Sequence, residues 1–504
     1  MTSRTRLVRV RRVVQAAFLL LFLYLATATR HPLTPLLPVD SFLRMDPLAQ
    51  LGAALAARDF VPYLLWAAPL LVATLLLGRF FCGWVCPMGT TLDLFRLRRF
   101  NPPPGKNEMG FRRFKYLLLA AALVAALAGS LVLMPLDPIT LLTRTFALYL
   151  YPALNAAVTG ALFALYERGI LPDLMVWIDT DLRGSLLPAA QPYFRLSWLF
   201  LLLFASIVAL NLVAHRFWCR YLCPLGAMLG LASRWSLLGR HSRAGCVGCG
   251  KCVARCRMGT IGAKGYANDG GECILCGDCA TVCPDRAISY GGRPSSGRYD
   301  PSRRQLLGVA GVAALGIAGL RADAPRKGTD AFDIRPPGAQ GAHFLDRCVR
   351  CGQCMKVCPS SGLQPSLLQA GLEGLWTPLL VARLGPCQYD CTACGEVCPT
   401  GAIQRLELES KRQAIIGTAY VDQRRCIPWV DGGDCIVCQE LCPVSPKAIA
   451  LEDTEATGDD GTTVEVRRPR VIRDRCIGCG ICEHHCPVPG EAAIRVYGIG
   501  TPTA

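Results

Sequence analysis

Residues 246–256 read CVGCGKCVARC, and residues 273–284 read CILCGDCATVCP. Both segments have the spacing C-x2-C-x2-C-x3-C, in which one tight turn presents three thiolates and the fourth thiolate comes from a neighbouring motif. A [4Fe–4S] cluster needs four converging thiolates, so two adjacent motifs predict two clusters. Structural zinc sites are built from shorter C-x2-C units, and the long duplicated spacing therefore favours iron–sulfur clusters over zinc.

The exchange of the fourth cysteine between these two motifs predicts the ligands of both clusters. We expect the first cluster at Cys246, Cys249, Cys252 and Cys283. We expect the second at Cys273, Cys276, Cys279 and Cys256. Arg257 stands where a proline usually follows the last cysteine of such a motif.

Four further motifs lie in the last third of the chain, two with regular spacing and two with first gaps of three and eight residues. In chain order they comprise Cys348, Cys351, Cys354 and Cys358; Cys387, Cys391, Cys394 and Cys398; Cys426, Cys435, Cys438 and Cys442; and Cys476, Cys479, Cys482 and Cys486. These sixteen cysteines suffice for four more clusters. Spacing alone permits adjacent pairing of the motifs (first with second, third with fourth) and nested pairing (first with fourth, second with third).

Two cysteine pairs remain beside apolar segments. FCGWVCPMG at 81–89 contains Cys82 and Cys86, and WCRYLCPLG at 218–226 contains Cys219 and Cys223. The proline after each second cysteine disfavours helix at that cysteine, so each pair should mark a helix end. Three interpretations stay open: redox-active thiol pairs, one site in which four thiolates share a metal or cluster, and reduced structural cysteines. These four are the only redox candidates outside the six motifs, and no catalytic residue is assigned.

The first half of the chain predicts a membrane domain. Four apolar runs, at about 13–28, 61–81, 116–134 and 197–215, can each cross roughly 30 Å of hydrocarbon. The loop at 79–115 is rich in Lys and Arg, which predicts a cytoplasmic location. The apolar run at 146–166 contains Pro152 and Asn155 and lacks a basic cluster at its far end, so we interpret it as an interfacial or re-entrant helix. A crossing there would put the two cysteine pairs on opposite sides of the membrane.

The charge balance and the missing motifs exclude other classes of protein. Lys and Arg number 54 against 37 Asp and Glu, but the excess lies beside apolar runs, as expected for a topology signal, so no nucleic-acid partner is predicted. We find neither a P-loop nor a convincing dinucleotide fingerprint, and the C-x-x-C-H motif of attached haem is absent. Electron transfer is therefore favoured, with the clusters carrying the chemistry.

A twin-arginine pattern separates the two cysteine-rich regions. Ser302, Arg303 and Arg304 precede a weakly apolar stretch that ends near 320, as in export signals for folded cargo. We expect residues 344–504 to be periplasmic, with the apolar stretch cleaved or kept as a short fifth span. The alternative is an unused signal that leaves all six clusters inside the cell.

The expected fold class is an α-helical membrane domain of four spans, with the fifth as an alternative, plus two α+β bacterial-ferredoxin-type [4Fe–4S] domains. The expected domains are the membrane helical domain at 1–239, a cytoplasmic two-cluster domain at 240–290, a linker with the twin-arginine signal at 291–343, and a four-cluster domain at 344–504.

These features together resemble two known families. Residues 1–290, with four spans, two C-x3-C-P pairs and two cluster motifs, resemble the membrane ferredoxins NapH and MauN. Residues 302–504, with a twin-arginine start and four motifs, resemble the exported ferredoxins NapG and MauM, here fused to the first. The resemblance implies a quinol dehydrogenase of the bacterial inner membrane, with six [4Fe–4S] clusters. Its substrate would be quinol from the membrane quinone pool, and its electrons would go to a periplasmic reductase or other redox partner.

The resemblance also implies nested pairing in the last domain, as in four-cluster ferredoxin subunits of similar layout. The implied third cluster uses Cys348, Cys351, Cys354 and Cys486, and the fourth uses Cys476, Cys479, Cys482 and Cys358. The fifth uses Cys387, Cys391, Cys394 and Cys442, and the sixth uses Cys426, Cys435, Cys438 and Cys398.

Several polar residues at the ends of the expected spans have two interpretations. Asn211, His215 and Arg216 at the fourth span, and Asp137 and Arg144 after the third, are placed to be functional, with Asp137 and Arg144 as candidates for a quinone head group. Each could instead cap or anchor a helix.

A second hypothesis comes from another class of membrane ferredoxins. NosR-like and CcoG-like proteins share the C-x3-C-P pairs and are tied to the assembly or maintenance of metal sites. On that view the chain is an accessory reductant for a metalloenzyme. No flavin-type domain precedes the first span, and a CcoG-like protein would lack the four-cluster domain; both points favour the quinol dehydrogenase.

Overall fold

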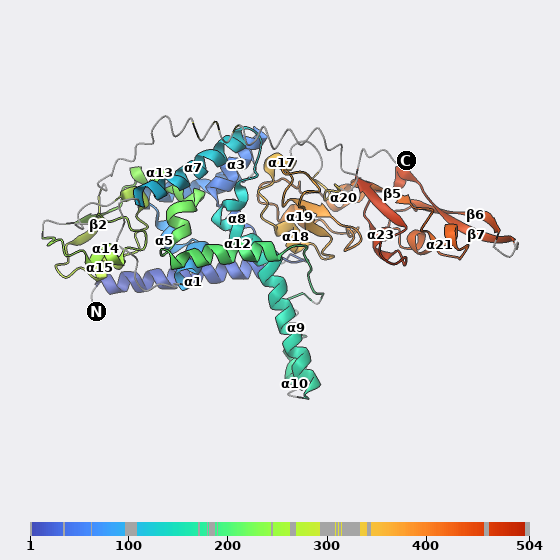
Figure 1. Cartoon of the computed structure of the whole chain (residues 1–504), viewed down its shortest axis with the longest axis horizontal. Helices are drawn as coiled ribbons and strands as arrows, with labels where there is room; N and C mark the ends of the chain where they lie inside the picture. The colour runs from blue at the N-terminus through green and yellow to red at the C-terminus, as the bar shows by residue number, and fades with distance from the viewer. Residues whose placement is uncertain are drawn as a thin grey trace. The chain divides into compact units, whose positions relative to one another are not determined.

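The computed structural model describes residues 3–33, 36–61, 63–95, 108–169, 172–178, 180, 187–188, 190–242, 245–262, 269–292, 308, 311, 314, 333–339, 344–457 and 463–498. The chain divides into two compact units (Figure 1). Unit 1 comprises Met1–Ala28, Pro35–Tyr151 and Ser197–Ala318, and unit 2 comprises Thr29–Thr34, Pro152–Leu196 and Gly319–Ala504. The twin-arginine motif at 302–307 lies outside the described residues.

Unit 1 combines a helical part with a small two-stranded part. Its α-helices are α1 (Ser3–Ala28), α2 (Ser41–Arg44), α3 (Pro47–Ala57), α4 (Ala68–Leu77), α5 (Phe80–Trp84), α6 (Pro87–Leu94), α7 (Glu108–Leu127), α8 (Pro138–Thr145), α12 (Trp198–Ala209), α13 (Pro224–Ala232), α14 (Lys251–Arg255) and α15 (Asp278–Thr281). Its 3-10 helices are η1 (Leu64–Ala67), η2 (Met134–Leu136), η5 (Leu210–Leu212), η7 (Ser233–Trp235) and η8 (Gly270–Glu272). Its π-helical turns are η3 (Phe146–Leu150) and η6 (Trp218–Leu222), and its strands are β1 (Gly239–Ser242) and β2 (Ile288–Gly291).

Two helices of unit 1 begin with the same Asp-Pro pair. Asp46 caps α3 by accepting the Leu48 N–H at 2.9 Å, and Asp137 caps α8 by accepting the N–H groups of Ile139 and Thr140 at 2.9 Å. Proline suits the first helical position because its missing N–H would be unpaired there. Both carboxyl groups are fully buried, and this burial raises the pKa of each. Asp137 is thus a helix cap, the structural one of its two interpretations.

Two helices among the described residues are long and apolar enough to cross a membrane, by length and composition alone: Thr5–Ala28 and Pro138–Glu167. The first matches an expected span, whereas the second includes the run at 146–166 that we interpreted as re-entrant. The expected spans at 61–81 and 197–215 contain shorter apolar helices, Leu64–Leu77 and Trp198–Leu212. The four-span domain is therefore not confirmed. One cause is Gly78, whose φ of 69° ends α4 and turns the chain before the cysteine pair.

The two-cluster segment of unit 1 is closed by an antiparallel strand pair. β1 pairs with β2 so that Gly239 lies opposite Gly291 and Ser242 opposite Ile288. Both cysteine motifs lie between these strands, and the short helices α14 and α15 follow their turns. The segment is the small α+β ferredoxin-type arrangement that the motifs predict.

Buried charges attach this segment to the helical part. Glu272 accepts hydrogen bonds from Arg79 (2.6 Å), Lys115 and the Tyr116 hydroxyl (2.5 Å). Burial by itself raises the pKa of Glu272, but the charges of Lys115 and Arg79 outweigh it and lower the pKa to about 2. The carboxylate is therefore ionised and carries the counter-charge for two buried cations.

The N-terminal helix also contacts this segment. Arg11 of α1, fully buried, donates to the Cys276 carbonyl at 2.6 Å and lies 3.1 Å from Asp278. Trp84 donates to the Leu275 carbonyl at 3.2 Å. Arg11 therefore contacts a cysteine motif, although its place in the sequence suggested only a role in membrane topology.

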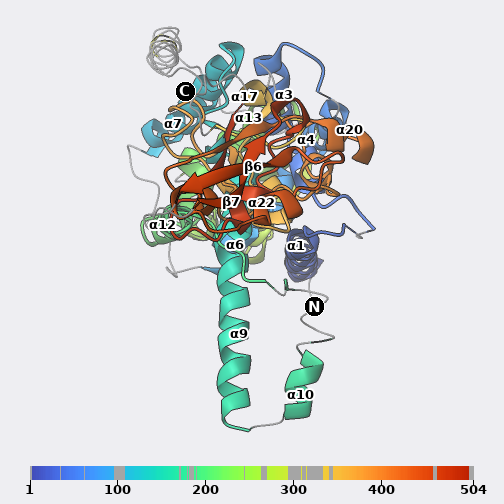
Figure 2. The same ribbon diagram turned by 90° about the vertical axis from the view of Figure 1, so that its right-hand side faces the viewer.

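Unit 2, with the helix leading into it, is built from short elements. Its helices are α9 (Tyr151–Glu167), α10 (Pro172–Trp177), α17 (Phe344–Arg347), α18 (Gln353–Val357), α19 (Ala393–Glu396), α20 (Leu408–Gln413), α21 (Ile427–Val430), α22 (Val437–Glu440), η9 (Arg473–Arg475) and α23 (Ile481–His485). Its strands are β3 (Leu363–Pro365), β4 (Pro378–Leu380), β5 (Gly417–Val421), β6 (Ile449–Thr457), β7 (Thr463–Val471) and β8 (Ile494–Gly498). Figure 2 shows α10 turned back alongside α9.

The cysteine-rich part of unit 2 forms two lobes (Figure 1). In the second lobe β5 pairs with β8, and the long antiparallel pair β6–β7 joins the third motif to the fourth. In the first lobe β3 pairs with β4 between the first and second motifs. Each lobe therefore contains two motifs that are consecutive in the sequence.

Gly83 provides a test of how the two parts of unit 1 pack. A Cβ atom there would lie 2.3 Å from the Ile274 carbonyl oxygen, too close for any side chain. We expect Gly83→Ala to lower the free energy of unfolding by about 1–3 kcal/mol through overpacking. Denaturant titration of the detergent-solubilised protein measures this. Gly291→Ala, whose Cβ would meet nothing within 4 Å, is the control, and an equal effect of both variants would contradict the close packing.

Glu272 provides a second test. Glu272→Gln leaves Arg79 and Lys115 buried without a counter-charge, and we expect it to cost about 3–5 kcal/mol of the free energy of unfolding. The control is Asp285→Asn at an exposed position of the same segment, for which we expect a change within about 0.5 kcal/mol. A stability of Glu272→Gln within that range would show that the buried pairs do not hold the segment.

Candidate functional site

The sixteen cysteines of unit 2 line four cavities, four cysteines to a cavity. Site A is lined by Cys348, Cys351, Cys354 and Cys398, and site B by Cys358, Cys387, Cys391 and Cys394. Site C is lined by Cys442, Cys476, Cys479 and Cys482, and site D by Cys426, Cys435, Cys438 and Cys486. The other lining residues are mostly apolar. Each site takes three cysteines from one motif and the fourth from its sequence neighbour.

This arrangement corrects the nested pairing. Cys486 lies with the third motif and not with the first, and Cys398 lies with the first motif and not with the third. Likewise Cys358 lines site B and Cys442 lines site C, which reverses the nested assignment of both. The reason is topological: β3–β4 and β6–β7 each turn the chain back, so a motif meets its nearest sequence neighbour before any distant one.

The four sites follow one another in the order A, B, C, D. Sites A and B share the first two motifs, and sites C and D share the last two. Between the lobes, the Cys387 N–H of site B donates to the Cys479 carbonyl of site C at 2.8 Å. Arg383 fixes the same junction, donating to the carbonyls of Glu483 (3.0 Å), Cys486 (2.9 Å) and Val488 (2.8 Å).

The local backbone suits cysteines that bind a common group. In the four regular motifs the short helix after the second cysteine begins at a glycine with φ between 69° and 81°: Gly250, Gly277, Gly352 and Gly480. In the two motifs with widened gaps the corresponding residues, Thr392 and Ile436, have φ of −118° and −117°. The fourth cysteine of several motifs accepts a backbone N–H from beyond its turn, for example Ile403 to Cys398 at 3.3 Å and Ala493 to Cys486 at 3.4 Å. Such hydrogen bonds to sulfur stabilise the thiolate form that ligates iron.

In unit 1, one cysteine of the first motif lies near thiols of the second motif. Burial, with the neighbouring thiolates of Cys279 and Cys256, raises the pKa of Cys273 to about 12. Burial raises the pKa of Cys252 too, with contributions from Cys246 and Cys249. Cys256 thus lies with the three cysteines of the other motif. A free thiol with so high a pKa stays protonated at neutral pH, so metal binding there must release a proton.

The two C-x3-C-P pairs also come together. Cys82, Cys86, Cys219 and Cys223, the membrane quartet, are free thiols of which the last three are buried. Burial raises the pKa of Cys86, and the thiolates of Cys82 and Cys219 raise it further, so thiols of both pairs face each other. Among the described residues no group of three or more His, Cys, Asp or Glu side chains is arranged to hold a single metal ion.

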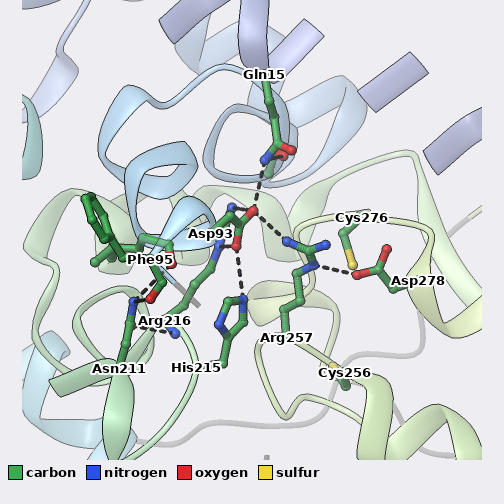
Figure 3. A network of polar contacts seen from close by, with 12 residues as sticks. Gln15, Asp93, Phe95, Asn211, His215, Arg216, Cys256, Arg257, Cys276 and Asp278 are labelled. Carbon is green, nitrogen blue, oxygen red and sulfur yellow. Dashed lines mark hydrogen bonds and ion pairs between the residues drawn. The ribbon is translucent and has the colours of Figure 1, made fainter. Parts of the chain in front are cut away.

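A polar network centred on Asp93 extends to the two-cluster segment (Figure 3). Asp93 accepts from Arg216 through both oxygens, at 2.8 and 2.7 Å, and lies 3.0 Å from His215 Nε2 and 2.6 Å from Arg257 Nη1. Burial opposes ionisation of Asp93, but the charge of Arg216 outweighs it and holds its pKa well below the ordinary range. Arg257 also forms an ion pair with Asp278, in which its Nε lies 2.5 Å from Asp278 Oδ2. The arginine at the usual proline position is therefore a link in this network.

The polar candidates at the span ends are engaged by the protein itself. Asn211 donates to the carbonyls of Leu92 (3.0 Å) and Phe95 (3.2 Å), and its Oδ1 accepts the Arg216 N–H at 3.1 Å. The guanidinium of Arg144 lies over the Phe200 ring, 5.2 Å from its centre. These contacts favour the structural interpretation of both residues.

Apart from Arg216, the charged partners of the cysteines were not predicted from the sequence. Asp93, Glu272 and Arg11 have no distinguishing motif, since each pairs with a residue far away in the chain. Arg79 and Arg216 did have a signal: each stands three residues before the first cysteine of a pair, in RFFC and RFWC.

Comparison with known protein families finds 4Fe-4S binding domains along the chain. A model described as a 4Fe-4S binding domain matches residues 59–104 and 196–243, the segments that contain the membrane quartet. A 4Fe-4S dicluster domain matches residues 272–362, and another 4Fe-4S binding domain matches residues 469–489. No solved structure matches the chain.

The chain is also similar to known ferredoxin-type proteins. The chain is 27% identical over 225 residues, 42% of its length, to the methylamine utilization ferredoxin-type protein MauN of Paracoccus denitrificans, of which it covers 63%. It is 38% identical over 215 residues, 42% of its length, to the ferredoxin-type protein NapG of Escherichia coli, covering 89% of that protein. It is 41% identical over 210 residues, 39% of its length, to the methylamine utilization ferredoxin-type protein MauM of Methylorubrum extorquens, again covering 89%. The chain therefore belongs to the family of ferredoxin-type iron–sulfur proteins that includes MauM and NapG.

Proposed function

We propose that this protein is a multi-pass iron–sulfur protein of the bacterial inner membrane that oxidises quinol and delivers the electrons to a periplasmic redox partner. The observation that carries the proposal is the unbroken order of sites A, B, C and D in unit 2. A row of four apolar, cysteine-lined cavities joined end to end suits electron transfer over distance better than catalysis at one pocket. The resemblance to quinol dehydrogenase components supports quinol as the donor.

The residues of the six sites fit [4Fe–4S] clusters. Each site A to D offers four thiols, an apolar lining and, for several cysteines, a backbone N–H to sulfur. In unit 1 the proposed ligands are Cys246, Cys249, Cys252 and Cys283 for one cluster, and Cys273, Cys276, Cys279 and Cys256 for the other. When bound, each cluster supplies a centre that takes up and gives up one electron at a time.

The protein contributes position and environment. Apolar residues such as Ile427, Val437 and Ile494 around site D exclude water, and Arg383 holds the two lobes of unit 2 together. Oxidation of one quinol to quinone releases two electrons and two protons, and the electrons leave singly to the periplasmic partner, which is thereby reduced.

The meeting of the two cysteine pairs supports the proposed topology. Cys86 and Cys219 lie on the same side of any membrane, so the chain between them crosses an even number of times. The expected spans at 116–134 and 197–215 provide two crossings, so we propose that the chain between these two spans makes no net crossing. Contacts of Arg11 and Arg112 with the two-cluster segment (Arg112 to the Met258 carbonyl, 2.9 Å) support one cytoplasmic face for the N-terminus, the basic loop and residues 240–290.

We propose that residues 344–504 lie in the periplasm, behind the twin-arginine signal, and that residues 1–290 are a NapH/MauN-like membrane ferredoxin fused to them. The match to MauN supports the first half of this organisation. Protease added to the periplasmic face of intact spheroplasts should cleave within 344–504 and leave 240–290 uncut.

The adjacent pairing has a direct test in the iron content. Cys348 and Cys398 share site A, so Cys348→Ala combined with Cys398→Ala should remove one cluster, about four iron atoms per chain. Nested pairing would place the two residues in different clusters and double the loss. The control is Cys348→Ala with Cys358→Ala, which spans sites A and B and should lose about eight iron atoms under either pairing.

Quinol oxidation has a test in the redox state of the clusters. Anaerobic membranes containing the full chain should lose visible iron–sulfur absorbance and gain reduced-cluster EPR signals when a short-chain quinol is added. Dithionite, added afterwards, defines full reduction. Quinone added to the reduced protein should reverse part of the change.

Two outcomes would count against this function. If dithionite reduces the clusters and quinol does not, the quinol dehydrogenase proposal fails. If quinol fails but a cytoplasmic reductant succeeds, the maturation-factor hypothesis gains support.

A further inference from the structure

Unit 2 contains a buried cation that the cluster ligands do not explain. Lys411 lies in the last turn of α20 and is the buried residue of that short helix, with 3% of its surface exposed. Its ammonium donates to the carbonyls of Gln388 and Tyr389, the second at 2.7 Å. Among the residues that the structure describes, no carboxylate forms an ion pair with it. A buried ammonium is costly unless a negative charge compensates it, so the counter-charge has to come from another kind of group.

The two carbonyl groups belong to the second cysteine motif of unit 2. Gln388 and Tyr389 lie between Cys387 and Cys391, where this motif has three residues instead of the usual two. The widened first gap thus presents two carbonyl oxygens to a cation from a later helix. This gives a role to a departure from regular spacing that the sequence alone did not explain.

The charge of Lys411 reaches cysteines of two different sites. Burial raises the pKa of Cys387 in site B to about 12, and the positive charge of Lys411 opposes this rise. Burial raises the pKa of Cys479 in site C to about 11, and Lys411 opposes that rise too. The two sites meet at this point, because the Cys387 N–H donates to the Cys479 carbonyl. Lys411 therefore lies at the junction of sites B and C.

The neighbouring Arg412 is a cation in a different environment. It forms ion pairs with Asp390 at 2.7 Å and Glu409 at 3.4 Å, and 34% of its side-chain surface is exposed. The Arg412 guanidinium and the Lys411 ammonium lie beside the same Tyr389 ring, 5.4 and 5.7 Å from its centre. Two successive residues thus provide one cation that is neutralised and solvated and one that is buried and faces thiols.

The charge of the proposed clusters supplies what Lys411 lacks. A [4Fe–4S] cluster held by four thiolates is an anion, reduction adds a further negative charge, and net charge is one of the properties that set its reduction potential. At an effective dielectric constant of about 20, a unit charge about 10 Å away changes such an equilibrium by about tenfold. Solvent and salt screen an exposed, ion-paired cation much more strongly.

We propose that the Lys411 ammonium is the shared counter-charge of the clusters at sites B and C and that it raises the reduction potentials of both. An electron that passes from site B to site C oxidises the first cluster and reduces the second. Because Lys411 favours the reduced form of both, it stabilises the electron on the middle of the row without opposing this step. The inference rests on the clusters proposed for these two sites, and on neither quinol nor the periplasmic partner.

A redox titration of the anaerobically purified full chain, with dithionite, mediators and EPR detection, tests the proposal without quinol. Lys411→Met removes the charge and keeps an unbranched side chain of similar length. At a fixed applied potential the ratio of reduced to oxidised cluster should fall about tenfold for two clusters, a shift of about 59 mV to more negative potential for a one-electron couple. Arg412→Gln, the matched control, removes the same charge from an ion-paired, solvated position and should shift no cluster measurably. Unchanged potentials in Lys411→Met, or equal shifts in both variants, would overturn the proposal.

A variant without the cluster of site B identifies which clusters respond. Cys391→Ala removes a ligand of site B, so Lys411→Met in that background should shift one cluster, at site C, instead of two. A shift of only one cluster in the chain that retains Cys391, or of two clusters in the Cys391→Ala background, would contradict a charge shared by sites B and C.

The iron content of the same samples guards against misassembled variants. If Lys411→Met lacks about eight iron atoms and Lys411→Arg keeps them, both clusters need the charge, which supports the proposal. Loss of the same iron from Lys411→Arg would show that the shape of the side chain matters and its charge does not, which overturns it. Clusters that shift in Lys411→Met but are not reduced by quinol would keep this inference and refute the quinol function alone.

Discussion

Each cysteine site of unit 2, and the membrane quartet, joins cysteines from two segments of the chain, and the rest of the fold follows from this constraint. A tight cysteine turn presents three thiolates, and the fourth must come from a second segment that is held in register with the first. In unit 2, β3–β4 and β6–β7 provide that register by returning the chain between the two motifs of each lobe. Two lobes result, and their meeting at Cys387 and Cys479 sets four sites in a row.

Unit 1 satisfies the same constraint with buried charges. The two-cluster segment is attached to the helices by Glu272 with Arg79 and Lys115, by Asp278 with Arg11 and Arg257, and by Asp93 with Arg216 and Arg257. Each carboxylate faces more than one cation, so removing a carboxylate deprives at least two buried cations of a counter-charge. Networks of this kind contribute little net stability compared with an apolar core, but they fix one arrangement because misaligned charges are costly.

Arg79 and Arg216 take part both in attaching the two-cluster segment to the helices and in the surroundings of the membrane quartet. Arg79 holds Glu272 on one side and lies beside the thiols of the membrane quartet on the other, and Arg216 does the same between Asp93 and that quartet. The position of the two-cluster segment and the environment of the quartet are therefore coupled, so a disturbance of either ion-pair network should reach the four thiols.

The sequence by itself determined the cysteine motifs, the ferredoxin-type character of both soluble segments and the first apolar helix. These depend on local spacing and composition, which a linear chain displays directly. It did not determine which distant motifs meet: resemblance favoured nesting, whereas the strand pairs bring neighbouring motifs together. It also did not identify Asp93, Glu272 or Arg11 as partners of the cysteine segments. Nor did it show that the segments FCGWVCPMG and WCRYLCPLG lie together in the fold. Those features depend on contacts between residues far apart in the chain. Only the tertiary structure decides which buried carboxylate pairs with which buried cation, because the packing of whole helices sets each pairing and no local pattern does.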